Sequence, residues 1–226
     1  MEQKKFVGTG LVPVRRHVGA TRRVAPTKNQ KKANKMEQKK ILDIFKKSKA
    51  LLKGHFLLSS GLHSDIYFEK FQVLQYPQYV ELLCKELAKL FWKEKAQVVV
   101  GPTTGGIIIA YEVAKNLKVR SIFAEMEEGV RVFKRGFDLK EGERVLIVDD
   151  ILTTGKSVQE VVDLVNKYNA KIVGLGVLLD RSGGKVQFNY PLKPLASVVA
   201  KTYKPEECPL CKEEKPLVKP GSRKII

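Results

Sequence analysis

Short, uninterrupted apolar runs alternate with helical patterns through the second half of the chain. Val98–Val100 is the first such run, and a helical pattern over 106–117 follows it. Further apolar runs cover 120–124, 144–149, 171–179 and 195–201, with another helical pattern over 157–168. This alternation predicts an α/β fold, in which helices cover both faces of a central, mostly parallel sheet. Ligands of such sheets bind at the carboxyl ends of the strands. Functional residues are therefore expected in the loops after Val100, Ala124, Val148 and Leu179.

The amino-terminal 35 residues differ in character from the rest of the chain. They carry ten lysines and arginines but one acid, within a chain of net charge +18, and they show no sustained helical or strand period. The string Met-Glu-Gln-Lys-Lys occurs at residue 1 and again at residue 36. We expect residues 1–35 to be a disordered, dispensable extension ahead of a second possible start. A nucleic-acid-binding arm and a targeting peptide are the alternatives that this basic composition leaves open.

Residues 36–226 are expected to form one domain. An amphipathic helix is predicted over 37–52, an aromatic-rich, irregular or strand-like stretch over 54–70, and a second helix over 77–93. Residues 36–75 would form a small hood beside the main sheet. The tail, 203–226, is rich in Pro and Lys and is expected to lie on the surface.

Composition narrows the class of protein further. No apolar run approaches the roughly 18 residues that a membrane span requires. The three cysteines, Cys84, Cys208 and Cys211, are an odd number in a chain long enough to form its own core, which favours a reducing compartment and predicts the cytoplasm. Cys208 and Cys211 have metal-like spacing. They supply only two ligands, however, so no metal ion bound directly by the protein is expected.

The most informative segment is Val145–Ser157, in which four apolar residues precede two acids and a hydroxyl-rich turn. The turn ends in Gly155 and opens a helix, whose unpaired N–H groups suit a phosphate. Asp149 and Asp150 would repel that phosphate, and they suit vicinal hydroxyls, which donate well to carboxylates. A second loop, Gly101–Gly106, also joins a buried strand to a helix, and its small residues let backbone amides approach an anion.

Val145–Ser157 closely resembles the ribose-phosphate signature of the type I phosphoribosyltransferases. The resemblance implies that Asp149 and Asp150 hold the ribose hydroxyls of phosphoribosyl pyrophosphate (PRPP). It assigns the 5′-phosphate to Thr153, Thr154, Gly155, Lys156 and Ser157. In that family the loop matching Thr103, Thr104 and Gly105 binds pyrophosphate. Many orotate-specific members carry a lysine at the position of Gly105.

The acceptor base is suggested by the aromatic stretch Phe56–Phe68, which resembles the hood of orotate phosphoribosyltransferases. A planar pyrimidine needs an aromatic face and a few fixed polar groups. An amphipathic hairpin with core aromatics is the alternative interpretation of this stretch. Arg181 follows an apolar run at the position where the family pairs an arginine with the orotate carboxylate, for which its planar fork is suited. The residues expected to contact orotate are Ser60, Tyr67, Phe68, Thr153 and Arg181.

Residues 125–138 fall where these enzymes have a mobile catalytic loop. Such a loop closes over the substrates and stabilises the leaving pyrophosphate. Lys134 and Arg135 are the candidate catalytic cations, and an exposed charged hairpin is the alternative interpretation. Many orotate-specific members have a histidine in this loop, whereas the histidines of this chain are His17, His55 and His63.

The resemblance as a whole implies the reaction of orotate with PRPP to give orotidine 5′-monophosphate and pyrophosphate. Mg²⁺ would travel with the diphosphate, and a homodimer is expected. Membrane and nucleic acid are not expected partners. Two alternatives remain at this point: a phosphoribosyltransferase for a purine or another pyrimidine, and a nucleic-acid-binding regulator that uses the same fold with residues 1–35 as its arm.

Overall fold

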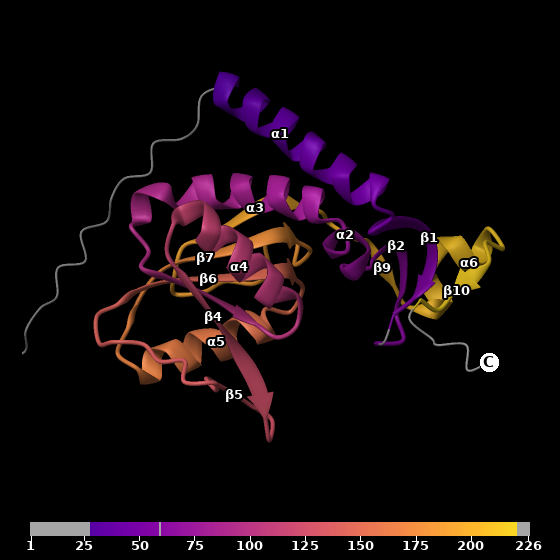
Figure 1. Ribbon diagram of the computed structural model, residues 1–226. Helices are drawn as coiled ribbons and strands as arrows, with labels where there is room; N and C mark the ends of the chain where they lie inside the picture. The colour runs from indigo at the N-terminus through magenta and orange to yellow at the C-terminus, as the bar shows by residue number, and fades with distance from the viewer. Residues whose placement is uncertain (1–27, 59, 221–226) are drawn as a thin grey trace, which may run out of the picture.

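The computed structural model describes the backbone of residues 28–58 and 60–220, and the side chains from Gln38 onward within those ranges. Predictions for residues 1–27 lie outside the described part. Two sheets make up the fold, a large one and a small one beside it (Figure 1). No helix of the described residues is long and apolar enough to cross a membrane.

The large sheet has six strands in the order β5-β4-β3-β6-β7-β8. Every neighbouring pair in it is parallel except β4 and β5, which form a hairpin. The predicted mostly parallel sheet is thus confirmed. Its strands are β3 (Val98–Pro102), β4 (Arg120–Glu127), β5 (Val130–Val132), β6 (Arg144–Leu152), β7 (Lys171–Asp180) and β8 (Leu192–Ser197).

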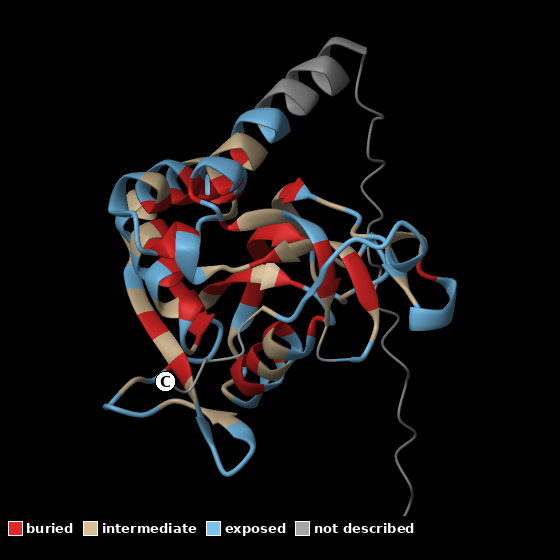
Figure 2. Ribbon diagram, turned by 90° about the vertical axis from the view of Figure 1, so that its right-hand side faces the viewer, coloured by how far each residue is buried: buried red, intermediate tan, exposed pale blue. Residues whose placement is uncertain are grey.

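Successive residues of the central strands face opposite cores, which explains why these strands lack an apolar–polar alternation. Val99 and Leu146 belong to the core beneath one set of helices, while Val98 and Val145 belong to the core on the other face. Figure 2 shows buried residues concentrated along these strands and on the inward sides of the helices.

Helices cover both faces of the large sheet, as Figure 1 shows. On one face lie α3 (Pro77–Phe91), which ends in a short 3₁₀ turn, η1 (Trp92–Glu94), and α4 (Gly105–Leu117). On the other face lies α5 (Lys156–Lys167). The first helix, α1 (Lys28–Lys47), adds Ile41 and Phe45 to the core on the α3 side. A one-turn helix, α2 (Phe71–Leu74), joins the small sheet to α3.

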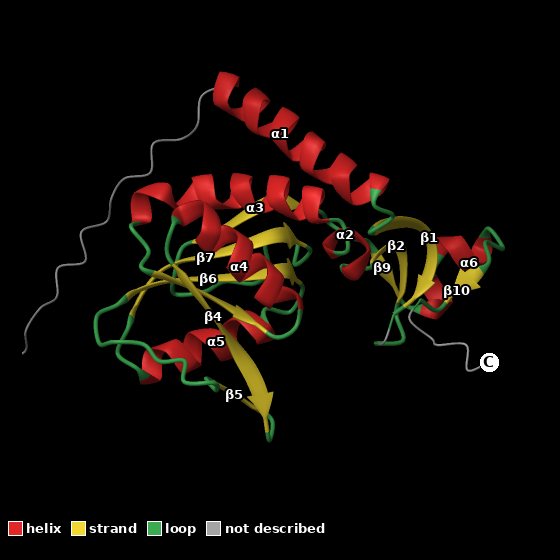
Figure 3. Ribbon diagram, viewed as in Figure 1, coloured by secondary structure: helices red, strands yellow, loops and turns green. Residues whose placement is uncertain are grey.

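The small sheet combines the two ends of the domain, in the order β10-β1-β2-β9 (Figure 3). The hood supplies β1 (Leu51–Leu57) and β2 (His63–Phe68), and the tail supplies β9 (Thr202–Tyr203) and β10 (Leu217–Val218). Between the two tail strands lie η2 (Pro205–Glu207) and α6 (Pro209–Lys212).

Three details differ from the predictions. The first helix begins at Lys28 and ends at Lys47, so the last part of the predicted extension is helical, and β1 takes the residues after it. The helical spacing of Val80, Leu83, Leu87, Leu90 and Phe91 predicts the buried face of α3, but Leu90 is 40% exposed and Cys84 is buried on that face. The tail does more than lie on the surface, since it supplies two strands and the fully buried Cys208.

The position of the site follows from the strand order. From β3 the chain crosses through α4 to β4, which lies on one side of β3. After the β4–β5 hairpin the chain forms β6, which lies on the other side of β3. The carboxyl ends of β3 and β6 are therefore a topological switch point, where open α/β sheets bind their ligands.

Candidate active site

Asp149 and Asp150 lie within the carboxyl-terminal part of β6 and are both buried, with 5% and 3% of their surfaces exposed. The hydroxyl of Ser157, in the first turn of α5, donates to Oδ2 of Asp149 over 2.8 Å. Burial, and then the charge of Asp150, raises the pKa of Asp149 above the usual aspartate value of 3.8. Burial likewise raises the pKa of Asp150. Two adjacent buried carboxylates are costly without polar partners, so this end of the strand is built to receive donors.

Lys70 forms an ion pair with the acid pair, through Asp150, and it is not among the site residues predicted from the sequence. Its ammonium lies 3.0 Å from Oδ2 and 3.4 Å from Oδ1 of Asp150. Only Oδ1 has hydrogen-bond geometry toward it, so Oδ2 is ion-paired but accepts no hydrogen bond from the described residues. Lys70 opposes the effect of burial on the pKa of Asp150. The hood thus supplies a cation to the acids of the large sheet.

The turn after β6 presents hydroxyls to the open side of the sheet edge. Thr153 and Thr154 are exposed, and Gly155 then begins α5 with a φ of 79°, a left-handed conformation that favours glycine. A Cβ at Gly155 would also lie 2.6 Å from Cγ1 of Val186. Lys156 is exposed, and its ammonium lies 3.9 Å from Oε1 of Glu160. The predicted cradle residues therefore gather at the amino end of α5, where helix N–H groups favour an anion.

The second predicted loop, between β3 and α4, lies directly against the acid pair. A Cβ built on Gly105 would lie 1.7 Å from Oδ2 of Asp150, so no side chain fits there. The lysine that many orotate-specific enzymes carry at this position has no room here, and the ammonium of Lys70 already lies beside the same carboxylate. Thr103 is half-buried and Thr104 is exposed. Oγ1 of Thr103 accepts a hydrogen bond of 2.8 Å from Arg131.

The residues expected to contact the acceptor base share one cavity. It has a volume of about 670 Å³, and Ser60, Tyr67, Phe68, Thr153 and Arg181 all line it. A neighbouring cavity of about 400 Å³ shares Tyr67, Phe68, Thr153 and Arg181 with it and adds Lys70 and Asp150. The two cavities therefore form a continuous site, with the hood on one side and the acid pair on the other.

Arg181 is the polar centre of this cavity. Its backbone N–H bonds the carbonyl of Leu152 over 2.8 Å, which fixes the residue directly after the end of β7. Its guanidinium carbon lies 4.9 Å from the centroid of the Phe68 ring, a cation–π contact. Nε of Arg181 is buried and has no hydrogen-bond partner among the described residues. Burial lowers the pKa of Arg181, against the influence of Tyr67. A half-buried guanidinium fork whose Nε is an unused donor suits a planar anion.

The predicted catalytic cations lie on the segment that follows the β4–β5 hairpin, and they are paired with acids of that hairpin. The ammonium of Lys134 lies 2.5 Å from Oε1 of Glu127, and Nε of Arg135 lies 2.8 Å from Oε1 of Glu125. Both cations are exposed and line neither cavity of the site. Arg131 of β5 is the cation that reaches the switch point, through Thr103. It was not singled out in the sequence, because nothing local distinguishes it from the other charges of the hairpin.

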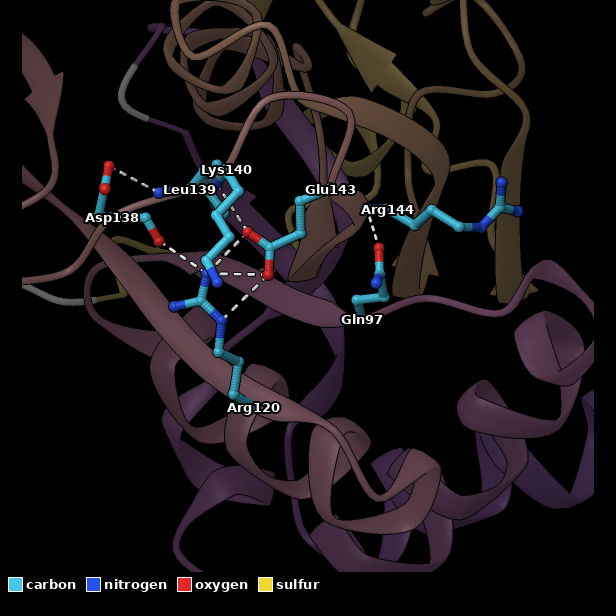
Figure 4. A network of polar contacts seen from close by, with 7 residues as sticks. All are labelled: Gln97, Arg120, Asp138, Leu139, Lys140, Glu143 and Arg144. Atoms are coloured by element: carbon cyan, nitrogen blue, oxygen red, sulfur yellow. Dashed lines mark hydrogen bonds and ion pairs between the residues drawn. The ribbon is translucent and has the colours of Figure 1, made fainter.

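Another cavity, of about 610 Å³, lies at the opposite edge of the sheet, where β4 and β6 begin. Two of its charged groups, Arg120 and Glu143, are partners of one another, as Figure 4 shows. Nη2 of Arg120 donates to both carboxylate oxygens of Glu143 and to the carbonyl of Asp138. The amide of Lys140 also donates to Glu143, over 2.9 Å. This network closes the loop between β5 and β6, and it offers no acid pair or aromatic face to a substrate.

The cysteine pair of the tail has potential metal ligands beside it that the sequence did not reveal. The fold brings His55 and His63 of the hood against Cys208 and Cys211. The two pairs are about 150 residues apart in the sequence, and short strands with mixed patterns give no sign that they meet. The tail also lines the larger cavity of the site, through Lys219 and Pro220.

Comparison with known proteins agrees with this geometry. Residues 73–203 match the phosphoribosyl transferase domain family. An orotate phosphoribosyltransferase of Thermoanaerobacter is 53% identical over 190 residues, which are 84% of this chain and 100% of that protein. The Thermotoga maritima orotate phosphoribosyltransferase is 48% identical over 183 residues, which are 81% of this chain and 98% of the relative.

Solved structures agree on the fold. Orotate phosphoribosyltransferase from Aeropyrum pernix superposes with a TM-score of 0.60 at 25% identity, covering 70% of this chain and 93% of its own. An adenine phosphoribosyltransferase from Thermoanaerobacter pseudethanolicus superposes with a TM-score of 0.53 at 19% identity, covering 59% and 88%. The fold is thus shared by enzymes for different bases. The two relatives named above with about 50% identity are both orotate phosphoribosyltransferases. The chain belongs to the orotate phosphoribosyltransferase family of the type I phosphoribosyltransferases.

Proposed function

We propose that the two joined cavities bind PRPP and orotate side by side, and that the protein converts them to orotidine 5′-monophosphate and pyrophosphate, a step of pyrimidine nucleotide synthesis. The observation that carries this proposal is the buried, unused Nε of Arg181 beside the Phe68 ring, in a cavity that continues to Asp150. An arginine fork over an aromatic face recognises a planar carboxylate, which orotate has and the common purine bases lack.

The acid pair would hold the sugar. Asp149 and Asp150 accept the two ribose hydroxyls, while the turn from Thr153 to Ser157 holds the 5′-phosphate. Oδ2 of Asp150 is the oxygen best placed to accept, since it is buried and ion-paired with Lys70 but accepts no hydrogen bond among the described residues. A hydroxyl donor would supply that missing hydrogen bond.

The diphosphate would lie along the loop of Thr103, Thr104 and Gly105. Gly105 is in contact with Asp150, so the loop amides and the ribose site are held at a fixed separation. As the glycosidic bond to pyrophosphate breaks, positive charge develops on the ribose ring and negative charge on the leaving group. No protein nucleophile is required, because orotate itself attacks, and the protein acts by positioning and charge stabilisation.

Lys134 and Arg135 would neutralise the leaving pyrophosphate when their loop closes over the site. In the structure their partners are Glu127 and Glu125. These ion pairs are largely exposed and weak, so closure exchanges them for phosphate oxygens at small cost. Closure also excludes water, which would otherwise compete with orotate for the ribosyl group.

Mg²⁺ fits the same site as a companion of the diphosphate. The protein groups nearest to the ribose position are carboxylates and hydroxyls, the hard oxygen donors that Mg²⁺ prefers, and Mg²⁺ commonly keeps several waters. We propose no direct protein ligand for it. Bound with PRPP, it supplies charge neutralisation at the pyrophosphate oxygens.

We also propose that the protein is a homodimer and resides in the cytoplasm. Members of this family usually share their mobile loops between subunits, and the cysteines of this chain form no disulfide in the structure. Light scattering should give a mass near twice the chain mass of 25.5 kDa. A monomer with full activity would contradict the dimer.

The test of function is the loss of orotate absorbance with purified protein, PRPP and Mg²⁺, with uracil, adenine, hypoxanthine and xanthine as parallel acceptors. Consumption of orotate alone is expected. Turnover of another base would preserve the PRPP site and remove the role given to Arg181. No turnover with any base, together with salt-dependent RNA or DNA binding, would favour the regulator instead.

A further inference from the structure

Four potential metal ligands converge between the hood and the tail, away from the substrate cavities. They are the ring nitrogens of His55 and His63 and the thiols of Cys208 and Cys211, and all four atoms lie within 4.8 Å of one another. His55, His63 and Cys208 are buried, with at most 5% of their surfaces exposed. Cys211 is exposed. The two buried imidazoles and the buried thiol of Cys208 favour a common partner, because they lose their hydration there.

Hydrogen bonds within the cluster leave it only partly satisfied. Nδ1 of His55 lies 2.9 Å from the carbonyl oxygen of Lys215, which can only accept, so Nδ1 carries a proton, and Nε2 of the neutral ring presents one lone pair. Three groups surround that one lone pair: Nδ1 of His63 at 2.8 Å, Sγ of Cys208 at 3.5 Å and Sγ of Cys211 at 3.6 Å. One lone pair cannot accept well from all three, whereas a cation at the centre engages every ligand at once.

The distances fit a tetrahedral ion. With Zn–S of about 2.3 Å and Zn–N of about 2.0–2.1 Å, tetrahedral angles place sulfur and nitrogen ligands roughly 3.6 Å apart and two nitrogens roughly 3.3 Å apart. Three of the four sulfur–nitrogen distances are 3.3, 3.5 and 3.6 Å, close to this value. All four ligand atoms lie within 4.8 Å of one another, so the wider pairs would draw closer around an ion. The two nitrogens lie 2.8 Å apart and would separate by a few tenths of an ångström around an ion. Two imidazoles and two thiolates in this geometry are the ligand set of structural zinc.

The surroundings of His55 have the second feature of a metal site. A metal-bound histidine usually donates its other N–H to a carbonyl or carboxylate, which fixes the ring and its tautomer. The carbonyl of Lys215 does this for His55, and it belongs to the same tail segment that carries the cysteines. Register supports the arrangement, since His55 pairs with Leu217 of β10 and His63 pairs with Tyr203 of β9.

We propose that His55, His63, Cys208 and Cys211 form a structural Zn²⁺ site that fastens the carboxyl-terminal tail to the hood. The hood supplies one pair of ligands from β1 and β2, and the tail supplies the other from the start of α6, which lies beside them in Figure 1. Four protein ligands leave no open position for a substrate, so the ion is structural rather than catalytic.

The proposed zinc site lies on the tail that forms part of the wall of the acceptor cavity. Tail residues Lys219 and Pro220 line that cavity together with Ser60 of the hood, and so does Thr202 at the start of β9. The tail strands β9 and β10 have two residues each, too few to hold the tail by backbone pairing alone. The ion would therefore keep one wall of the acceptor cavity in place.

The decisive measurement is the metal content of the full-length protein purified without chelator, by inductively coupled plasma mass spectrometry. About one Zn²⁺ per chain is expected for the wild type. The double variant Cys208→Ser with Cys211→Ser should hold less than about a tenth of that. Cys84→Ala is the matched control, because this third cysteine is buried in the core beneath α3, and it should keep the full zinc content.

If the double variant fails to fold, a second measurement on the wild type still tests the proposal. Protein stripped of metal and given Co²⁺ should develop the thiolate charge-transfer and visible bands of a tetrahedral cobalt site. It should also resist proteolysis of the tail better than the stripped form. Wild-type protein that carries no zinc and takes up no Co²⁺ would overturn the proposal, as would a Cys208–Cys211 disulfide in the native protein or full zinc in the double variant. Turnover of orotate is independent of these readouts, so failure here leaves the proposed reaction untouched.

Discussion

The two sheets of this protein are stabilised in different ways and contribute different halves of the proposed active site. The central strands of the large sheet bury apolar side chains on both faces, beneath α3 and α4 on one side and α5 on the other. The small sheet joins two hood strands to two short tail strands and buries two histidines and a cysteine where they meet. The large sheet carries the acid pair, and the small sheet carries the aromatic face.

This difference shows how one fold serves several acceptor bases. A hydrophobic core on both faces fixes the carboxyl ends of β3 and β6 firmly, as the common chemistry of PRPP requires. The hood adds Phe45 of α1 and Phe68 of β2 to this core, but β1, β9 and β10 add no fully buried residue to it. Positions of the hood and tail outside the core can therefore vary with the base. Enzymes for orotate and for adenine accordingly share the fold of this chain. The following variants separate the two contributions.

The largest effect is expected from the acid pair of the large sheet. The double variant Asp149→Asn with Asp150→Asn should lose turnover by on the order of a thousandfold or more, because buried acceptors for the ribose hydroxyls are replaced by amides. Steady-state assays with orotate and PRPP measure this loss. Activity within tenfold of the wild type would remove the ribose site from these residues.

The same variant should be at least as stable as the wild type. Burial raises the folded-state pKa of both acids above the unfolded value, so the folded protein binds these protons more tightly. Their contribution to stability is present at low pH and is lost as the pH rises through the raised pKa. The melting temperature of the variant should therefore exceed that of the wild type near pH 8, and the gap should narrow toward pH 4.

The cations after the hairpin come next. Lys134→Ala with Arg135→Ala should lower kcat by roughly a hundredfold while the melting temperature stays the same, since the ion pairs that they break are exposed. Lys89→Ala, which breaks a comparable exposed pair with Glu86 on α3, is the control and should keep full activity. An unchanged kcat in the double variant would transfer the role to Arg131, the cation already in contact with Thr103.

Arg181 tests the acceptor half of the site. Arg181→Lys keeps the charge but loses the planar fork, so KM for orotate should rise by about tenfold to a hundredfold while KM for PRPP stays within a factor of about two. Arg144→Lys, at the opposite edge of the large sheet, should change neither constant. Equal rises in both KM values for Arg181→Lys would mean that this arginine holds the site together rather than recognising orotate.

The same division explains what the sequence alone could predict. The strands of the large sheet and the turn after Asp150 were predictable, because a buried strand and an anion-binding turn are local patterns. The small sheet was not, because its tail strands have two residues each and pair with a hood far away in the sequence. Lys70 and Arg131 were missed for a related reason: a cation that acts on a distant element has no local signature.

The cluster of His55, His63, Cys208 and Cys211 is the clearest case of a feature that no local sequence pattern reveals. Each pair is uninformative by itself, since a lone histidine pair and a single Cys-x-x-C are common in proteins without zinc. Only the closure of the small sheet brings the four side chains together. A site assembled from both ends of a domain becomes visible only when the fold is known.

The smallest effect is expected at the far edge of the large sheet, and it completes the contrast between the two edges. Glu143→Gln weakens the contact with Arg120, so the free energy of unfolding at pH 7 should fall by about 0.5–1 kcal/mol, as measured by urea denaturation. The reduction stays small because Arg120 is 43% exposed. Turnover should not change, because no residue of this network lines the substrate cavities.

The pKa of Glu143 is shifted in the opposite direction to the pKa values of Asp149 and Asp150, so its contribution to stability depends on pH in the opposite way. Burial alone would raise the pKa of Glu143, but hydrogen bonds from Arg120 and from the amide of Lys140 outweigh it and hold the pKa below its usual value of 4.5. The stability that Glu143 contributes is therefore present above that value and is lost as the pH falls through the lowered pKa. Glu143→Gln should be less stable than the wild type, and this deficit should shrink in acid. The double variant of Asp149 and Asp150 should instead be more stable than the wild type, and that excess should shrink in acid. If Glu143→Gln instead impaired turnover at pH 7, the loop between β5 and β6 would couple the two edges, and catalysis would depend on more than the carboxyl ends of the strands.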